Sequence, residues 1–352
     1  MLPSERRRKG ESSNGFTNRK INQREGNVTH PQVLCLGEIL YDFLADQVGV
    51  TYEQVQSWTP YPGGAPANVA CGLAKLGVAA GFIGCVGQDQ WGESLVSILH
   101  TAGVETLGVQ HHSSAPTRAV YVVRSATGDR TFVGFGGQPT TVFADTQLQA
   151  DHLPVSLFEQ AEYLVLGTLE LAYPNSRKAI ARALDLADDY YTKILVDVNW
   201  RPVFWPDPAI APSQIRELIA HADFLKLSEE EADWLFQTKD PAVIAHQLGN
   251  LEGIIVTAGE KGCTYFLGET EGQVPAFAVP VQDTTGAGDS FVAGFLHQLC
   301  QYGIKRLADP DIAHRAVQYA SAVGALTTTR PGAIAAQPTA AEVETFLAQH
   351  GR

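Results

Sequence analysis

Short apolar runs alternate with segments of helical periodicity from Gln32 onward. The apolar runs are continuous rather than alternating, as expected for strands that are covered on both faces of a sheet. Strands are predicted at 33–36, 81–86, 163–166, 194–197, 224–227 and 254–256, and helices at 68–76, 176–187 and 312–326. This alternation predicts an α/β fold with a doubly wound, mostly parallel sheet flanked by helices. In such sheets ligands bind beyond the carboxyl ends of the strands.

One region departs from the alternation of strands and helices. Residues 117–123 and 130–133 flank Thr127-Gly128-Asp129 and are predicted to form a β-hairpin. Together with residues 45–60, the hairpin is expected to form a small sheet that projects from the main domain. We therefore predict a small β lid from about 45–60 and 110–135, which covers a site. The alternative is an edge hairpin of the core.

Residues 1–30 differ from the rest of the chain. They show almost no apolar periodicity and are locally basic, with seven Lys or Arg against three Glu. We predict a disordered N-terminal tail. The alternative is a targeting or anionic-surface-binding tail centred on residues 6–9, although the acidic residues argue against an organellar transit peptide. Residues 31–352 are predicted to form one domain that includes the lid.

Composition and charge narrow the class of partner. The 352 residues carry a net charge of -13, which argues against nucleic acid because a phosphate backbone would be repelled. The five cysteines are scattered and form no Cys-x-x-Cys pair, which indicates reduced thiols in a cytoplasmic protein. No apolar run approaches the roughly 18 residues needed to span a membrane. We therefore expect neither a nucleic-acid nor a membrane partner.

The run Asp283-Thr-Thr-Gly-Ala-Gly-Asp-Ser-Phe291 precedes a predicted helix at 290–300. Free N–H groups and the positive end of the helix dipole would converge at Gly286-Ala287-Gly288, which suits an anion such as a phosphoryl group. A carboxylate beside that anion is repulsive, so Asp289 fits best as a base that takes a hydroxyl proton during phosphoryl transfer. The alternative is that Asp289 caps the helix and the glycines only turn the chain.

A second motif runs from Gly63 to Gly77, with the sequence GGAPANVACGLAKLG. Asn68 is predicted to open an apolar-periodic helix that ends at Gly77. The glycine pair ahead of this helix exceeds what a helix start requires. It indicates a backbone pressed against a ligand, with the Asn68 amide hydrogen-bonded to ligand hydroxyls.

Together these two motifs resemble the two signatures of the ribokinase-like (PfkB-type) carbohydrate kinases. The first matches Gly-Gly-x-x-x-Asn-x-Ala followed by Leu-Gly, and the second matches Asp-Thr-x-Gly-Ala-Gly-Asp. The resemblance extends from Gln32 to roughly Pro338. It implies a ribokinase-like fold, ATP-dependent phosphorylation of a sugar hydroxyl, and a requirement for Mg²⁺. A homodimer formed through the lid is a further candidate.

The resemblance also assigns roles at the sugar and phosphoryl sites. It implies Asp289 as the catalytic base; Gly286, Ala287 and Gly288 as the anion hole; and Asp42, Gly63, Gly64 and Asn68 as sugar-binding residues. Arg201 lies in a run from Asp197 to Trp205 that resembles the Asp-x-Asn-x-Arg…Trp run of fructokinases and 2-keto-3-deoxygluconate kinases. Its place just after a strand favours a sugar contact over a surface or interface role.

The nucleotide side is implied in the same way. Thr257, Gly259 and Gly262 resemble the nucleotide-phosphate loop, Lys226 and Ser228 precede it, and Glu231 is the expected residue near magnesium. Ser228 stands where the family often has Asn, which would alter the water network around magnesium. A monovalent cation such as K⁺ is a further candidate cofactor, near Asp283, Thr285, Thr327, Arg330 and Gly332.

Fructose is the leading substrate from the sequence. Residues 135–140 lack the Arg-containing run that fructokinases tend to have after the hairpin. 2-Keto-3-deoxygluconate, another sugar or a nucleoside therefore stay open, although nucleoside kinases tend to lack the run around Arg201. A catalytically silent regulatory relative is the alternative from another class, but Asp289 and the anion-hole glycines are present. Neither a Gly-x-Gly-x-x-Gly after the first strand nor a Walker-type loop occurs.

Overall fold

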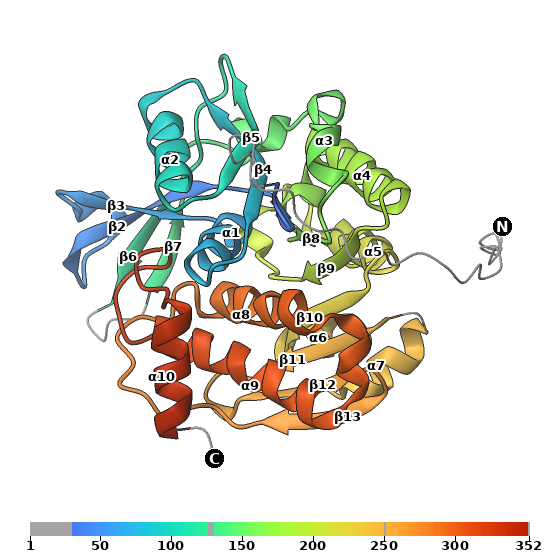
Figure 1. Ribbon diagram of the computed structural model, residues 1–352. Coiled ribbons are helices and arrows are strands. Elements are labelled where there is room, and N and C mark those ends of the chain that lie inside the picture. The colour runs from blue at the N-terminus through green and yellow to red at the C-terminus, as the bar shows by residue number, and fades with distance from the viewer. Residues whose placement is uncertain (1–29, 126–129, 250, 351–352) are drawn as a thin grey trace, which may run out of the picture.

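The computed structural model describes residues 30–125, 130–249 and 251–350. A nine-stranded sheet has the order β13-β12-β11-β10-β9-β8-β1-β4-β5 (Figure 1). Its strands are β1 Val33–Leu36, β4 Ala80–Gly87, β5 Glu105–His112, β8 Tyr163–Leu166, β9 Lys193–Asp197, β10 Phe224–Ser228, β11 Gly253–Thr257, β12 Cys263–Leu267 and β13 Thr270–Val274. All pairs from β5 to β11 are parallel, and β12 and β13 add an antiparallel edge. The predicted fold class and all six predicted core strands are confirmed.

Helices cover both faces of the nine-stranded sheet. One face carries α1 Ala65–Lys75, α2 Gln90–Thr101, α8 Ala287–Tyr302, α9 Pro310–Thr327 and α10 Ala340–His350. The other carries α3 Val155–Phe158, α4 Pro174–Asp189, α5 Ala211–Ile219, α6 Glu229–Phe236 and α7 Pro241–Leu248. Alternate residues of one strand point to opposite faces, so Val33 joins one core and Leu34 the other. This double burial explains why the strand sequences are continuously apolar.

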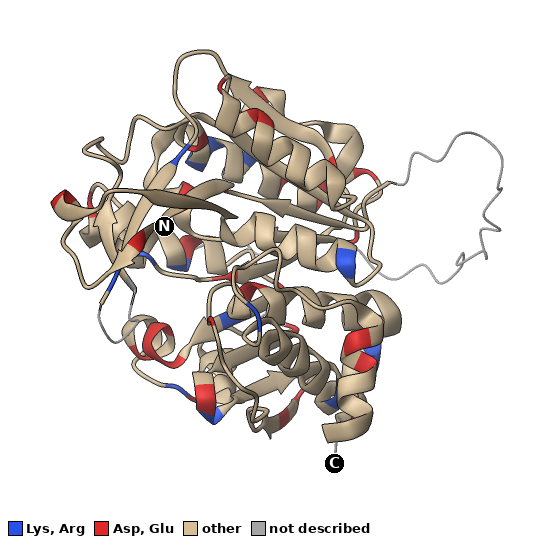
Figure 2. Ribbon diagram, turned by 90° about the vertical axis from the view of Figure 1, so that its left-hand side faces the viewer, with Lys and Arg blue, Asp and Glu red and all other residues tan. Residues whose placement is uncertain are grey.

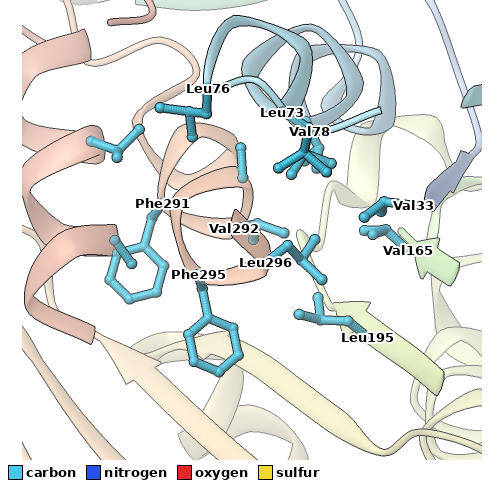
Figure 3. Close-up of a cluster of buried hydrophobic side chains, with 14 of the residues drawn as sticks. Val33, Leu73, Leu76, Val78, Val165, Leu195, Phe291, Val292, Phe295 and Leu296 are labelled. Atoms are coloured by element: carbon cyan, nitrogen blue, oxygen red, sulfur yellow. The ribbon is translucent and has the colours of Figure 1, made fainter. Parts of the chain in front are cut away.

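Helices α1 and α8 lie side by side in the middle of the molecule. Figure 3 shows Leu73 and Leu76 of α1 close to the side chains of Val292 and Leu296 in α8. Close approach is possible because a Cβ placed on Gly72 would lie only 2.9 Å from the Cβ of Ala293. The two helices that carry the sequence motifs are therefore held together by a dry core.

The predicted small sheet is present and has four strands in the order β3-β2-β6-β7. They are β2 Leu40–Val48, β3 Trp58–Gly63, β6 Ala119–Arg124 and β7 Arg130–Gly134, and the sheet lies to one side of the main domain (Figure 1). Its bounds differ from the prediction at two places. Strand β2 begins at Leu40, and residues 110–112 belong to β5 of the main sheet. The predicted turn 127–129 and the tail 1–29 lie outside the described residues.

A buried ion pair anchors this small sheet to the main domain. Arg118, directly before β6, makes a bidentate pair with Asp145, with Nη2 3.0 Å from Oδ1. Its guanidinium also donates to Thr140 and Tyr173. The carbonyl of Arg118 accepts the N–H of Tyr41 in β2 at 3.1 Å. Arg118 therefore connects the lid to the body, with its side chain bound to the body and its backbone bound to β2.

Charged residues are spread over the described surface, with Lys and Arg scattered among Asp and Glu (Figure 2). Within the described residues, none of the helices is both long and apolar enough to cross a membrane. All five cysteines are free thiols, and four of them are buried.

Candidate active site

Most of the residues singled out from the sequence lie at the carboxyl edge of the parallel strands. Strand β9 ends at Asp197, β10 ends at Ser228 and β11 ends at Thr257. These strands are neighbours, and Ser228 pairs with Thr257 in the sheet register. Helix α8 begins beside this edge (Figure 1). Ligand binding is expected at this place in a doubly wound sheet.

The start of α8 differs from the prediction by one turn. The helix begins at Ala287 rather than at residue 290, and Gly286 is its N-cap with φ 76°. Glycine is required there, because that conformation disfavours a side chain and a Cβ would lie 2.8 Å from the Cβ of Ala333. The predicted anion-hole residues Ala287 and Gly288 are thus the first two residues of the helix. N–H groups in the first turn have no acceptor within the helix, although that of Ala287 contacts the carbonyl of Thr284 at 3.3 Å. A helix N-terminus of this kind suits an anion.

Asp289 lies in the first turn of α8, where its carboxylate makes a tertiary contact. Its Oδ2 accepts a hydrogen bond of 2.7 Å from Nδ2 of Asn68 in α1, 221 residues away in sequence. Gly286 is the N-cap and has no side-chain cap bond. The capping role considered for Asp289 is therefore wrong. Burial raises the pKa of Asp289, while the Asn68 hydrogen bond, Lys226 and Arg201 oppose that increase.

Asn68 differs from its predicted position and contact. Helix α1 begins at Ala65, so Asn68 lies at its fourth residue instead of opening it. The side-chain amide, which was expected to bind ligand hydroxyls, donates to Asp289 in this structure. Asn68 is buried, and its Oδ1 has no hydrogen-bond partner among the described residues. The Asn68 amide therefore holds one oxygen of the Asp289 carboxylate.

The glycine pair before α1 brings the lid close to the main domain. A Cβ on Gly63 would lie 2.9 Å from a carboxylate oxygen of Asp42, which is in β2. Gly64 has φ 106°, and a Cβ there would lie 2.5 Å from the carbonyl oxygen of Glu38. Asp42 and these glycines are therefore adjacent, at the point where the lid joins α1. Both glycines lie where other protein groups approach closely.

Lys226 lies under the start of α8 among carboxylates. Its Nζ is 3.0 Å from both carboxylate oxygens of Asp197, and it would be 3.1 Å from a Cβ placed on Gly288. Burial alone would lower the pKa of Lys226, but Asp197, Glu231 and Asp289 outweigh that effect and raise it. Burial raises the pKa of Asp197 to about 6 against the opposing effect of Lys226. The Lys226 ammonium therefore supplies a positive charge among these carboxylates.

Ser228 and Glu231 form the capping box of α6. The Ser228 hydroxyl accepts the N–H of Glu231 at 3.2 Å, and Glu231 Oε2 accepts the N–H of Ser228 at 2.7 Å. The other oxygen, Oε1, accepts the N–H of Trp200 at 2.6 Å. Ser and Asn are comparable N-caps, so Ser228 can replace the family Asn in the helix start without structural cost.

Arg201 and the predicted nucleotide loop lie on either side of this capping box. Arg201 follows β9 and is exposed, with its guanidinium hydrogen-bonded to the carbonyl of Trp200. Thr257 ends β11, and its hydroxyl donates to the carbonyl of Leu227. Gly259 has φ 56° with open space around it, whereas Gly262 has φ 96° and lies against Val274. Of the two glycines, Gly259 leaves more room for a ligand.

Two loops converge where a monovalent cation was considered. Asp283 Oδ1 accepts from the N–H and hydroxyl of Thr285, and its Oδ2 accepts the N–H of Gly332 at 2.9 Å. The side chains of Thr327 and Arg330 have partners elsewhere. The Thr327 hydroxyl donates back into α9, and Arg330 pairs with Glu342.

Comparisons with known proteins agree with this geometry. Residues 30–340 match the family described as "pfkB family carbohydrate kinase". The chain belongs to the pfkB family of carbohydrate kinases. Membership confirms the predicted resemblance and the predicted enzyme class, an ATP-dependent carbohydrate kinase.

Several proteins that are similar to this carbohydrate kinase are named as fructokinases. It is 37% identical over 320 residues to "Probable fructokinase-5" of Arabidopsis thaliana, covering 90% of this chain and 97% of the relative. A crystal structure of fructokinase with bound ATP from Xylella fastidiosa has a TM-score of 0.82 and 31% identity, covering 90% and 98% of the two chains. A Vibrio cholerae fructokinase double mutant in a fructose-, ADP- and potassium-bound form has a TM-score of 0.77 and 28% identity, covering 90% and 98%.

The sequence motifs did not reveal every buried acid of this carbohydrate kinase. Glu38 accepts the N–H of Ala65 at 2.7 Å, and burial raises its pKa to about 7. Glu170 is fully buried, and its pKa is raised well above the usual range by burial and by Glu38. Asp197 could have been found because it ends a predicted strand. Glu170 gave no signal, because a single Glu after an apolar run is common on surfaces.

Proposed function

We propose that this carbohydrate kinase transfers the γ-phosphoryl group of ATP to a hydroxyl of fructose. The observation that carries the proposal is the partly buried Asp289 carboxylate, held by Asn68 in the first turn of α8 at the N-terminus of that helix. A base and an anion site on one helix turn suit in-line transfer. The similarity to fructokinases over about nine-tenths of the chain supports fructose as the acceptor.

In the proposed reaction, Asp289 acts directly on the acceptor. Its carboxylate takes the proton of the sugar hydroxyl while that oxygen forms a bond to the γ-phosphorus. The bond from phosphorus to the bridging oxygen breaks, and ADP leaves with that electron pair. The N–H groups of Ala287 and Gly288 stabilise negative charge on the transferred group, because they are fixed in place before the reaction. Its raised pKa makes Asp289 a stronger base than an exposed aspartate.

Magnesium fits this chain only in part. No group of three His, Cys, Asp or Glu side chains that could hold a metal occurs within residues 30–125, 130–249 and 251–350. Both oxygens of Glu231 already accept backbone N–H groups. When bound, Mg²⁺ usually keeps waters and binds through substrate phosphates and one or two carboxylates, and it offsets phosphate charge. We propose that it enters with ATP and that Glu231 contacts its waters.

The nucleotide phosphates are proposed to lie between the loop after β11 and the start of α8. Thr257, Gly259 and Gly262 belong to that loop, and Lys226 lies beneath the helix start. Ser228 contributes by capping α6, and this capping box fixes the side chain of Glu231. Positive charge from Lys226 and the helix N-terminus offsets the acidity of the chain locally.

The sugar is proposed to bind between the lid and α1. Asp42 and Gly63 face this junction, and Arg201 is close enough to lower the pKa of Asp289 by its charge. The face of the lid that carries Asp42 also carries Tyr61, which lies 3.9 Å from a Cβ placed on Gly332. That face is therefore directed at the main domain. Closure there would exclude water, which otherwise competes as phosphoryl acceptor.

Sugar binding is expected to slow hydrogen exchange in the lid strands β2 and β6, because closure would shield their backbone amides. Strand β8 in the middle of the main sheet serves as the internal control and should not change. Exchange measured by mass spectrometry at saturating fructose checks this. Equal exchange of β2 and β6 with and without sugar would show that the small sheet is not a lid.

An aromatic face of the lid, where it meets Trp91 of α2, is a candidate dimer interface. Phe43 stacks on Tyr121 at 5.2 Å, and Tyr52, Trp58 and Trp91 pack around them. We propose that a second copy of the chain covers this aromatic face. We also propose that the protein works in a reducing, cytoplasmic compartment. Sedimentation at several concentrations tests the dimer.

A monovalent cation is proposed at the junction of Asp283, Thr285 and Gly332. The Asp283 carboxylate joins the two loops there by accepting the N–H groups of Thr285 and Gly332, and a carboxylate oxygen is a ligand that an alkali cation can use. The potassium-bound form of the Vibrio cholerae relative supports a monovalent cation as a cofactor. Such a cation would fix the loop that leads into the anion hole.

The choice of sugar is tested by ADP release with fructose, 2-keto-3-deoxygluconate, ribose and a nucleoside. We expect the highest kcat/KM for fructose. The 2-keto-3-deoxygluconate alternative is kept because residues 135–140 lack arginine, and Gly136 and Gly137 have φ 64° and 78° there. A higher kcat/KM for 2-keto-3-deoxygluconate would reassign the substrate. If none of the acceptors leads to ADP release, a catalytically silent relative is supported.

A further inference from the structure

The segment 332–337 passes between the two halves of the proposed active site. At one end, the N–H of Gly332 bonds to Asp283, and Ala333 lies against Gly286 at the N-cap of α8. At the other end, Gln337 reaches α1. Its Nε2 donates a hydrogen bond of 2.7 Å to the backbone oxygen of Asn68. One short segment therefore contacts both the anion hole and the residue that holds the base.

Gln337 is built into the interface between α1 and α8. Only 2% of it is exposed, although it is a polar residue. Its amide lies over Gly72, where a Cβ would be 3.1 Å from Nε2. Gly72 is therefore small for two reasons, the approach of α8 and the approach of Gln337. The Oε1 of Gln337 has no partner among the described residues, so the bond to Asn68 is the specific polar contact of this side chain.

Lys75 binds the same segment from the far end of α1. Its Nζ lies 2.6 Å from the carbonyl oxygen of Ile334, 3.3 Å from that of Ala335 and 3.2 Å from that of Gln337. A single ammonium that gathers three carbonyls fixes the path of the backbone. Helix α1 is thus joined to 334–337 at two points, one near each end.

The side-chain amide of Asn68 is held at one atom only. Its Nδ2 bonds to Asp289, and its Oδ1 has no partner among the described residues. Its distance to Asp289 therefore depends on where the backbone of α1 lies. Gln337 fixes that backbone at Asn68 itself.

We infer that Gln337 is a positioning residue for phosphoryl transfer, which acts through Asn68 to set the place of the Asp289 carboxylate. Lys75 supports it by holding the segment. The inference rests on the proposed role of Asp289 as base. It extends that role to a residue outside both sequence motifs.

The expected consequence is a change in both rate and pH dependence. Methionine at position 337 keeps the length of the side chain and removes the donor. We expect kcat to fall roughly 5- to 30-fold with the KM for ATP unchanged, because small misplacements of a reacting group are costly. The acidic limb of the kcat profile should move to higher pH, because the Asn68 bond lowers the pKa of Asp289. The other charged groups near Asp289 are Lys226, Arg201, Asp197 and Glu38.

The test is a double-mutant cycle between Gln337→Met and Asn68→Ala, with thermal unfolding measured for each protein. If Gln337 acts through Asn68, its replacement should have almost no further effect on kcat once Asn68 is alanine. Additive losses, or a Gln337→Met protein with wild-type kcat and pH profile, would overturn the inference. If that variant does not fold, Lys75→Met provides the half-buried alternative, for which the same upward shift of the acidic limb is expected and an unchanged limb contradicts the inference.

Asp289→Asn separates this inference from the proposed function. If Asp289→Asn is inactive and Gln337→Met is normal, only the positioning role fails. If Asp289→Asn keeps near-wild-type turnover, the proposed base fails and the positioning role with it.

Discussion

Replacing Asp289 by asparagine is expected to lower turnover by roughly 10²–10⁴-fold, the usual contribution of a general base. Asparagine keeps the size of the side chain but cannot take the hydroxyl proton. Nucleotide affinity should persist, because the N–H groups of α8 remain in place. Turnover with the best sugar and ATP affinity by titration calorimetry are measured on the same preparation.

Asp283→Asn is the matched control, because it is the same substitution in the loop that leads into α8. Its carboxylate bonds to Thr285 and Gly332 and has no assigned part in proton transfer. We expect a smaller loss of turnover for this variant, through loop or cation-site integrity. If Asp289→Asn kept near-wild-type turnover, or if the two variants lost equal activity, the proposed base would be refuted.

Replacing Arg118 by methionine is expected to destabilise the protein by about 3–5 kcal/mol, because removal of one partner leaves the other charge buried. Arg118 is 1% exposed and Asp145 is 3% exposed. The guanidinium also lies 4.6 to 5.5 Å from the ring centres of four aromatic residues, Phe135, Phe143, Tyr173 and Phe204. The free energy of unfolding is measured by denaturant titration.

The control for Arg118 is the double variant Arg118→Met, Asp145→Leu. Apolar residues of similar volume often replace a buried ion pair without loss, so the double variant should recover much of the stability. Because Arg118 lies at the root of the lid, the single variant should also raise the KM for sugar. A single variant that unfolds at the wild-type denaturant concentration would show that the ion pair does not anchor the lid.

The main sheet could be predicted almost completely from sequence, and the physical reason is its double burial. Residues 33–36 and 163–166 were predicted to the residue, because a parallel strand between two helix layers has no polar positions to obscure it. The lid was harder. Strand β2 begins at Leu40 rather than at about 45, because its apolar face is shared between the small sheet and the main domain.

The start of α8 shows what local patterns cannot supply. Glycines at 286 and 288 suggested a loop, whereas Gly288 lies inside the helix, where a Cβ would be 3.1 Å from Nζ of Lys226. The bond between Asn68 and Asp289 joins residues 221 positions apart. Its existence depends on the packing of α1 on α8, which no local motif encodes. Gln337 escaped notice for the same reason.

The central claim, that this kinase phosphorylates fructose, is tested most directly by ³¹P NMR of its products from fructose, ATP and Mg²⁺. The account predicts one fructose phosphomonoester for each ADP formed, and neither product in the absence of sugar. ADP accompanied only by inorganic phosphate, or unchanged ATP in the presence of fructose, would contradict it.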